Sequence, residues 1–120
     1  MHTKEEIDQL ADDFKQCQKI LIALGDENRQ HMILEMMKTG KCSGVRVNEI
    51  TEKTHLSRPA VSHHLQILKD AGILKMRREA TKNYYYFDPD MKSFELLMGI
   101  LQRAIRITTE LPDRSRTYED

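Results

Sequence analysis

Apolar residues recur every three or four positions over three long stretches of the chain, which is the spacing of one face of an α-helix. These stretches cover residues 3–24, 27–38 and 89–110. Two shorter helices are predicted between them, over about residues 48–54 and 58–71, and only three residues separate these two. The hydrophobic pattern therefore predicts a mainly helical chain.

A short β-hairpin is predicted between the last two helices. The aromatic run from Tyr84 to Phe87 favours a strand, and residues 73–78 form a second candidate strand. The polar residues 79–82 lie between them as a turn. Four helices, a hairpin and a final helix make a winged helix-turn-helix layout with an extra helix at each end.

The length of 120 residues suits one domain, which we expect over residues 1–112 with a polar tail over 113–120. No apolar run approaches the ~20 residues that cross a bilayer, so no membrane association is expected. The acidic, polar N-terminus is unlike a signal peptide, and two cysteines are too few for a disulfide scaffold. We therefore expect a cytoplasmic protein.

The formal net charge is zero, but the charge is unevenly distributed. Residues 53–86 hold seven basic and two acidic groups and so carry +5, while the segments on either side are acidic. A local cationic block of this kind can meet the phosphates of a nucleic acid.

The helix over 58–71 divides into an apolar and a polar side. Val61, Leu65 and Leu68 share one side and are predicted to be buried, whereas His64 lies nearer the apolar boundary and is predicted to be structural. Polar side chains at the start of such a helix can read base edges in the major groove of DNA. The candidates for this role are Ser57, Arg58, Pro59, Ser62, His63 and Gln66.

The hairpin adds a second group of candidates. Basic and amide side chains near a hairpin tip suit the minor groove or the flanking phosphates. This group consists of Lys75, Arg77, Arg78, Lys82 and Asn83.

The last helix carries more apolar surface than one face of a small domain can cover, so a second copy of the chain is predicted to cover the rest. The resulting homodimer would use apolar side chains from the first and last helices. The predicted interface residues are Leu10, Phe14, Cys17, Leu97, Met98, Leu101 and Ile105.

The run LSRPAVSHHLQILKDAGIL followed by KMRREATKNYYYF resembles the recognition helix and wing of the ArsR family, and LGDENRQHMILEMM resembles that family's second helix, where an Arg at position 29 is usual. The resemblance covers roughly residues 20–87. It implies a homodimeric regulator that binds an inverted-repeat operator in double-stranded DNA, usually represses, and releases DNA when an inducer binds. Two positions depart from the family. The family often has a small residue where this chain has Thr51, and a glycine where it has His55. His55 is therefore expected to accept a positive φ.

Both standard metal sites of the family are absent. One uses a Cys-x-Cys motif where this chain has 47–51 without cysteine, and the other uses Asp and His on the last helix, where residues 89–110 contain no histidine. No metal or cofactor is therefore predicted. A redox pair of Cys17 and Cys42, a new site joining these to His31, an organic or protein inducer, and no inducer at all remain open.

The sequence gives less support to two other classes of function. A winged helix that binds proteins and not DNA is disfavoured by the cationic block over 53–86. An enzyme is disfavoured because the sequence holds no nucleophile motif, phosphate-binding glycine loop or metal-hydrolase spacing.

Overall fold

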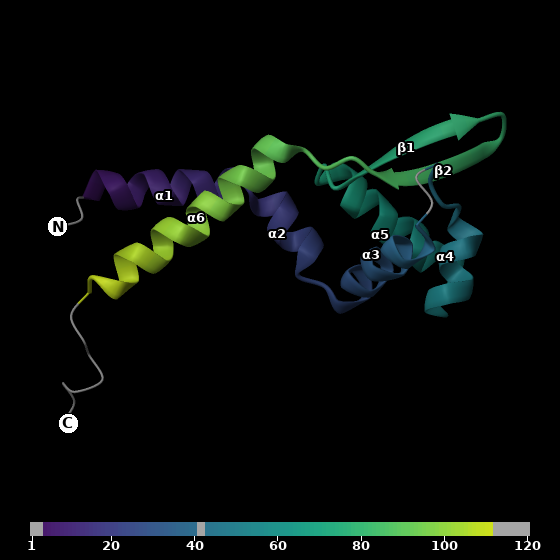
Figure 1. Ribbon diagram of the computed structural model, residues 1–120, viewed down its shortest axis with the longest axis horizontal. Coiled ribbons are helices and arrows are strands. Elements are labelled where there is room, and N and C mark those ends of the chain that lie inside the picture. The colour runs from purple at the N-terminus through teal and green to yellow at the C-terminus, as the bar shows by residue number, and fades with distance from the viewer. Residues whose placement is uncertain (1–3, 41–42, 112–120) are drawn as a thin grey trace, which may run out of the picture. The chain divides into compact units, whose positions relative to one another are not determined.

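The computed structural model describes residues 4–40 and 43–111, which form six helices and two strands (Figure 1). The chain divides into two compact units. One unit runs from Gln18 to Met91, and the other combines the first helix with the last. The elements are α1 (Lys4–Gln16), α2 (Gln18–Leu24), α3 (Glu27–Thr39), α4 (Val47–Thr54), α5 (Arg58–Asp70), β1 (Leu74–Glu79), β2 (Lys82–Phe87) and α6 (Met91–Thr109).

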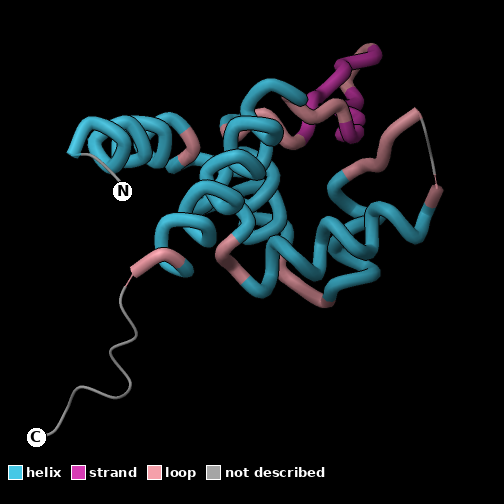
Figure 2. Tube along the Cα trace, turned by 60° about the vertical axis from the view of Figure 1, so that its left-hand side comes forward, coloured by secondary structure: helices cyan, strands magenta, loops and turns pink. Residues whose placement is uncertain are grey.

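The unit from Gln18 to Met91 is the predicted winged helix-turn-helix: α4 and α5 form the helix-turn-helix, and the hairpin of β1 and β2 forms the wing (Figure 2). Its core is built from apolar side chains of α2, α3, α4, α5 and β1, because each of these helices has one apolar face. The buried side chains include Ile20, Ala23, Met32, Met36, Ile50, Val61, Leu65, Leu68 and Leu74.

The strands of the wing are antiparallel, with Leu74 opposite Phe87 at the base and Glu79 opposite Lys82 at the tip. The predicted four-residue turn is shorter, because residues 79 and 82 pair with each other and leave only Ala80 and Thr81 between the strands. Ala80 has a φ of 56°, the left-handed backbone that tight hairpin turns require.

The helix predicted over residues 3–24 is two helices that meet at Cys17. The Cys17 N–H is shared between the carbonyls of Asp13 (3.2 Å) and Phe14 (3.1 Å), a pattern typical of helix ends. The apolar spacing continues through this break, so periodicity alone could not show it. Cys17 is buried, in agreement with its place in the apolar spacing, but Asp13 is buried as well, whereas Ile7 and Leu21 are exposed.

The last helix begins at Met91 and not at residue 89. Asp88 stands where it could cap a helix that begins at residue 89, but its carboxylate instead accepts a hydrogen bond from Lys75 Nζ at 2.8 Å. The Asp90 N–H donates to the Gly72 carbonyl at 3.0 Å. Both contacts hold residues 88–90 against the turn and strand that follow α5, and so delay the start of the helix.

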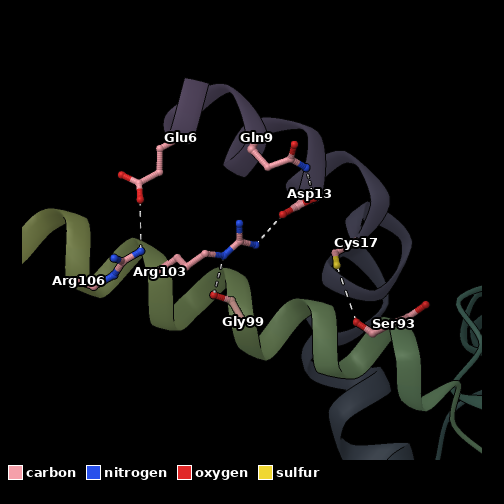
Figure 3. Close-up of polar contacts among 8 residues, drawn as sticks. All are labelled: Glu6, Gln9, Asp13, Cys17, Ser93, Gly99, Arg103 and Arg106. Atoms are coloured by element: carbon pink, nitrogen blue, oxygen red, sulfur yellow. Dashed lines mark hydrogen bonds and ion pairs between the residues drawn. The ribbon is translucent and has the colours of Figure 1, made fainter. Parts of the chain in front are cut away.

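Helices α1 and α6 pair through polar side chains (Figure 3). Arg103 Nη2 lies 2.6 Å from the carboxylate of Asp13, which also accepts a hydrogen bond from Gln9. Arg106 lies 3.5 Å from Glu6, nearer the start of α1. The pairs run in opposite order along the two helices, which are therefore antiparallel. The hydrogen bond from Arg103 holds the pKa of Asp13 below its usual value of 3.8.

A stripe of apolar side chains on α6 remains exposed. Met98, Leu101 and Ile105 are 51–62% exposed, and they are spaced so that they share one side of the helix. Phe14 and Ile7 on α1 are exposed as well. None of the described helices is long and apolar enough to cross a membrane, and the predicted tail over 113–120 lies outside the described residues.

Replacing Asp13 with Asn is expected to lower the thermal unfolding midpoint at pH 7 by a few degrees, because the Arg103 guanidinium loses its charged partner. The pKa of Asp13 is lowered by folding, so its stabilising effect is present above pH 3.8 and is lost as the pH falls below that value. Circular dichroism melts should therefore show the wild type and D13N converging in acid. The control D12N changes an exposed neighbour on α1; equal midpoints for D13N and wild type at pH 7 would contradict the role of this pair.

Candidate DNA-binding surface

Helix α5 begins where its sequence provides a cap. Ser57 has extended backbone angles, and its hydroxyl accepts a hydrogen bond from the Ala60 N–H at 3.2 Å. Pro59 stands in the first turn, where its missing N–H costs nothing. The start of α5 is therefore held by local chemistry, and its first polar side chains have a defined direction.

All six predicted residues of α5 and its cap are exposed. Pro59, His63 and Gln66 lie roughly opposite Val61 and Leu65, which are fully buried. The side-chain N–H of Gln66 donates to Asp70 Oδ1 at 2.8 Å, which leaves the amide oxygen of Gln66 as a hydrogen-bond acceptor. The sequence thus placed the polar face of this helix correctly.

The turn between α4 and α5 depends on a strained residue. His55 has a φ of 62°, the positive value that was expected for it, and its N–H donates to the Thr51 carbonyl at 2.9 Å. The buried Thr54 hydroxyl donates to the Ile50 carbonyl at 2.8 Å and receives the Leu56 N–H at 3.4 Å. These contacts fix the angle at which α5 leaves the turn.

One contact to α5 was missed by the sequence reasoning. Arg29 on α3 is only 7% exposed, and one of its terminal nitrogens lies 3.1 Å from His64 Nδ1. The same guanidinium donates to the carbonyls of Ala23 (2.8 Å) and Ile22 (3.0 Å) at the end of α2. The position of His64 at the apolar boundary was a signal for a structural role, but nothing in the sequence named its partner.

The cations at the base and middle of the wing are paired in the free protein. Lys75 bonds Asp88, and this hydrogen bond raises the pKa of Lys75 above its usual value. Arg77 Nε lies 2.6 Å from Glu79, and its guanidinium stands over the Tyr84 ring at 5.0 Å from the centroid. The exposed fraction of Arg77 is intermediate, so it is held in place more firmly than an ordinary surface arginine.

The other three wing candidates lie nearer the tip. Arg78 is exposed and donates to the Ala80 carbonyl at 3.1 Å, and Lys82 is exposed. Asn83 is half-buried, and its Oδ1 is buried with no hydrogen-bond partner in the part of the chain that the structure describes. The tip therefore presents two exposed cations, while Asn83 points its oxygen inward.

The predicted interface residues fall into two groups. Phe14, Met98, Leu101 and Ile105 are exposed, and Leu10 is partly exposed. The other two, Cys17 and Leu97, are buried within a single copy of the chain.

The described residues contain no group of three or more His, Cys, Asp or Glu side chains that could hold a metal ion. Cys17 donates its S–H to the Ser93 carbonyl at 3.9 Å, and burial raises the pKa of its thiol. A raised pKa disfavours the reactive thiolate. Cys42 lies outside the described residues, so the structure gives no distance for the predicted redox pair.

A family described as bacterial regulatory protein, arsR family, matches residues 28–75, which include α3, the helix-turn-helix and the start of β1. The uncharacterized HTH-type transcriptional regulator MJ1325 of Methanocaldococcus jannaschii is 38% identical over 77 residues, which are 64% of this chain and 83% of that protein. The arsenic resistance transcriptional regulator ArsR1 of Pseudomonas putida is 34% identical over 80 residues, 65% of this chain and 60% of that protein.

Among solved structures, a homodimeric winged helix-turn-helix DNA-binding domain from Mycobacterium bovis superposes with a TM-score of 0.54 at 18% identity, covering 98% of this chain and 97% of that one. This likeness confirms the fold. With the sequence matches it defines a winged helix-turn-helix transcriptional regulator. The chain belongs to the arsR family of bacterial regulatory proteins.

Replacing His55 with Gly should keep or raise stability, by up to about 1 kcal/mol, because glycine adopts a positive φ without strain. H55V should lower stability by roughly 1–2 kcal/mol, because a β-branched residue fits this backbone poorly. Urea unfolding measures both changes. The control H31V alters an exposed helical histidine on α3; an H55V midpoint equal to that of wild type would contradict the strain at this turn.

Proposed function

We propose that this chain is a sequence-specific regulator that binds double-stranded DNA as a homodimer in the cytoplasm and represses transcription from an inverted-repeat operator. The observation that carries the proposal is the exposed polar face of α5 together with the cationic wing, both on the unit from Gln18 to Met91. Membership of a regulator family supports it.

The chemistry of α5 suits the reading of base edges. Ser62, His63 and Gln66 each offer hydrogen-bond donors or acceptors, and the exposed Arg58 can reach a guanine or a phosphate. Their position on the solvent side of a capped helix is the arrangement by which a recognition helix enters the major groove.

The wing suits contact with the DNA backbone. Arg78 and Lys82 are exposed near its tip, and the Arg77 guanidinium lies over the Tyr84 ring. Since Arg77 is also paired with Glu79, binding to a phosphate would exchange one anionic partner for another. The wing is therefore expected to supply affinity that depends on salt and little on sequence.

The exposed stripe of Met98, Leu101 and Ile105 supports the homodimer. Water-exposed apolar side chains in a row on one helix favour association with a matching surface, and a second copy provides one. Two copies can then hold two α5 helices one duplex turn apart, which corresponds to the two halves of an inverted repeat. The Mycobacterium bovis domain of the same fold is homodimeric.

Two alternatives have less support. A protein-binding winged helix has no need for exposed cations at the wing tip, where Arg78 and Lys82 lie. A thiol-based redox repressor that uses Cys17 and Cys42 would require oxidation of a fully buried thiol with a raised pKa.

The test is to select bound duplexes from a random DNA pool and to measure affinity by fluorescence anisotropy across a salt series. R77A/R78A should weaken binding to all duplexes and lower the salt slope by about 2, because two phosphate contacts are lost. H63A and Q66A should leave the slope unchanged and lose roughly 1–3 kcal/mol of discrimination at single base pairs.

Two further variants make this test sharper. E79Q removes the anion beside Arg77, so it should tighten binding and steepen the salt slope. K15A/K19A removes two exposed positive charges outside the wing and should change little. Failure to enrich any duplex, or equal losses for K15A/K19A and R77A/R78A, would contradict the proposal.

A further inference from the structure

The guanidinium of Arg29 joins three helices of the unit that carries α5. Its Nε and one terminal nitrogen donate to carbonyls at the end of α2, while its backbone N–H donates to Asp26 Oδ1 at 3.1 Å. The other terminal nitrogen lies 3.1 Å from Nδ1 of His64 on α5. From its position on α3, Arg29 therefore bonds the backbone of α2 and the His64 ring of α5 at once.

This contact determines the protonation state of the His64 ring. An arginine has only N–H donors and stays charged at all physiological pH values. A hydrogen bond between Arg29 and Nδ1 therefore requires Nδ1 to be the acceptor, so His64 is neutral and carries its proton on Nε2. A proton on Nδ1 would place two donors and two positive charges 3.1 Å apart.

We propose that His64 positions the recognition helix through Arg29, and that protonation of its ring breaks this contact and weakens DNA binding in acid. The inference rests on the proposed function, since it concerns how α5 is held for DNA. Protonation of His64 would affect the candidate DNA-binding side of α5, because His63 and Gln66, which lie close to His64 along the helix, are exposed candidates for base contact.

The charged groups around His64 agree with this direction. Burial lowers the pKa of His64 below its usual 6.5, the Asp26 carboxylate opposes the shift, and Arg29 and His63 add to it. Since the folded protein binds this proton more weakly than an unfolded chain, the stabilising effect of neutral His64 is present above pH 6.5 and is lost as the pH falls below it.

The experiment compares wild type with H64N, because the Asn side-chain oxygen can occupy the place of Nδ1 and does not titrate. Affinity for a selected duplex is measured by anisotropy at pH 7.5 and pH 5.5. The dissociation constant at pH 5.5 is then divided by the dissociation constant at pH 7.5. Only the wild type can protonate the ring at position 64, so the wild-type ratio should exceed that of H64N by about threefold or more. The control H31N, at an exposed histidine of α3, should keep the wild-type ratio.

A second measurement keeps the inference testable if H64N does not fold. Nitrogen-15 NMR of the wild-type histidine rings should show His64 with its proton on Nε2 at pH 7.5, and the pKa of this ring should lie below its usual 6.5. A proton on Nδ1, or equal pH ratios for wild type and H64N, would overturn the inference. Failure of the proposed function has a different signature, since the wild type would then bind no selected duplex at either pH.

Discussion

The burial of one side of α5 is the constraint on which the candidate site depends. Val61, Leu65 and Leu68 are fully buried, and a helix that buries this stripe must turn its opposite side to water. Loss of any of these side chains would leave a cavity in the core and lower the stability of the unit that carries α5. The polar residues at the start of α5 thus owe their exposure to apolar residues that have no part in the chemistry of binding.

Local patterns were sufficient to predict this part of the molecule. The apolar spacing of α5, the cap at Ser57 and the aromatic run of β2 are short-range signals, and each predicted its element to within a residue or two. The positive φ of His55 was predicted from the resemblance to the ArsR family, which often has glycine at this position. The exposure of Pro59, His63 and Gln66 was predicted from their angle around the helix.

These local patterns could not predict contacts between residues that lie far apart in the sequence. Asp13 meets Arg103 across 90 positions and Arg29 meets His64 across 35, and neither spacing leaves a periodic signal. The same limit explains two errors at helix ends. Asp88 resembled a cap but pairs with Lys75, and the break at Cys17 interrupts a stretch whose apolar spacing is continuous.

The most direct test of the account is to map the surface that contacts DNA by NMR. Amide shifts of the nitrogen-15-labelled protein are followed while a duplex selected from a random pool is added. We expect the largest changes at the first two turns of α5 and in the wing around Arg77 and Lys82, with few in α1. Changes confined to α1 and α6, or an unperturbed α5 in a saturated complex, would contradict the assignment of the DNA-binding surface.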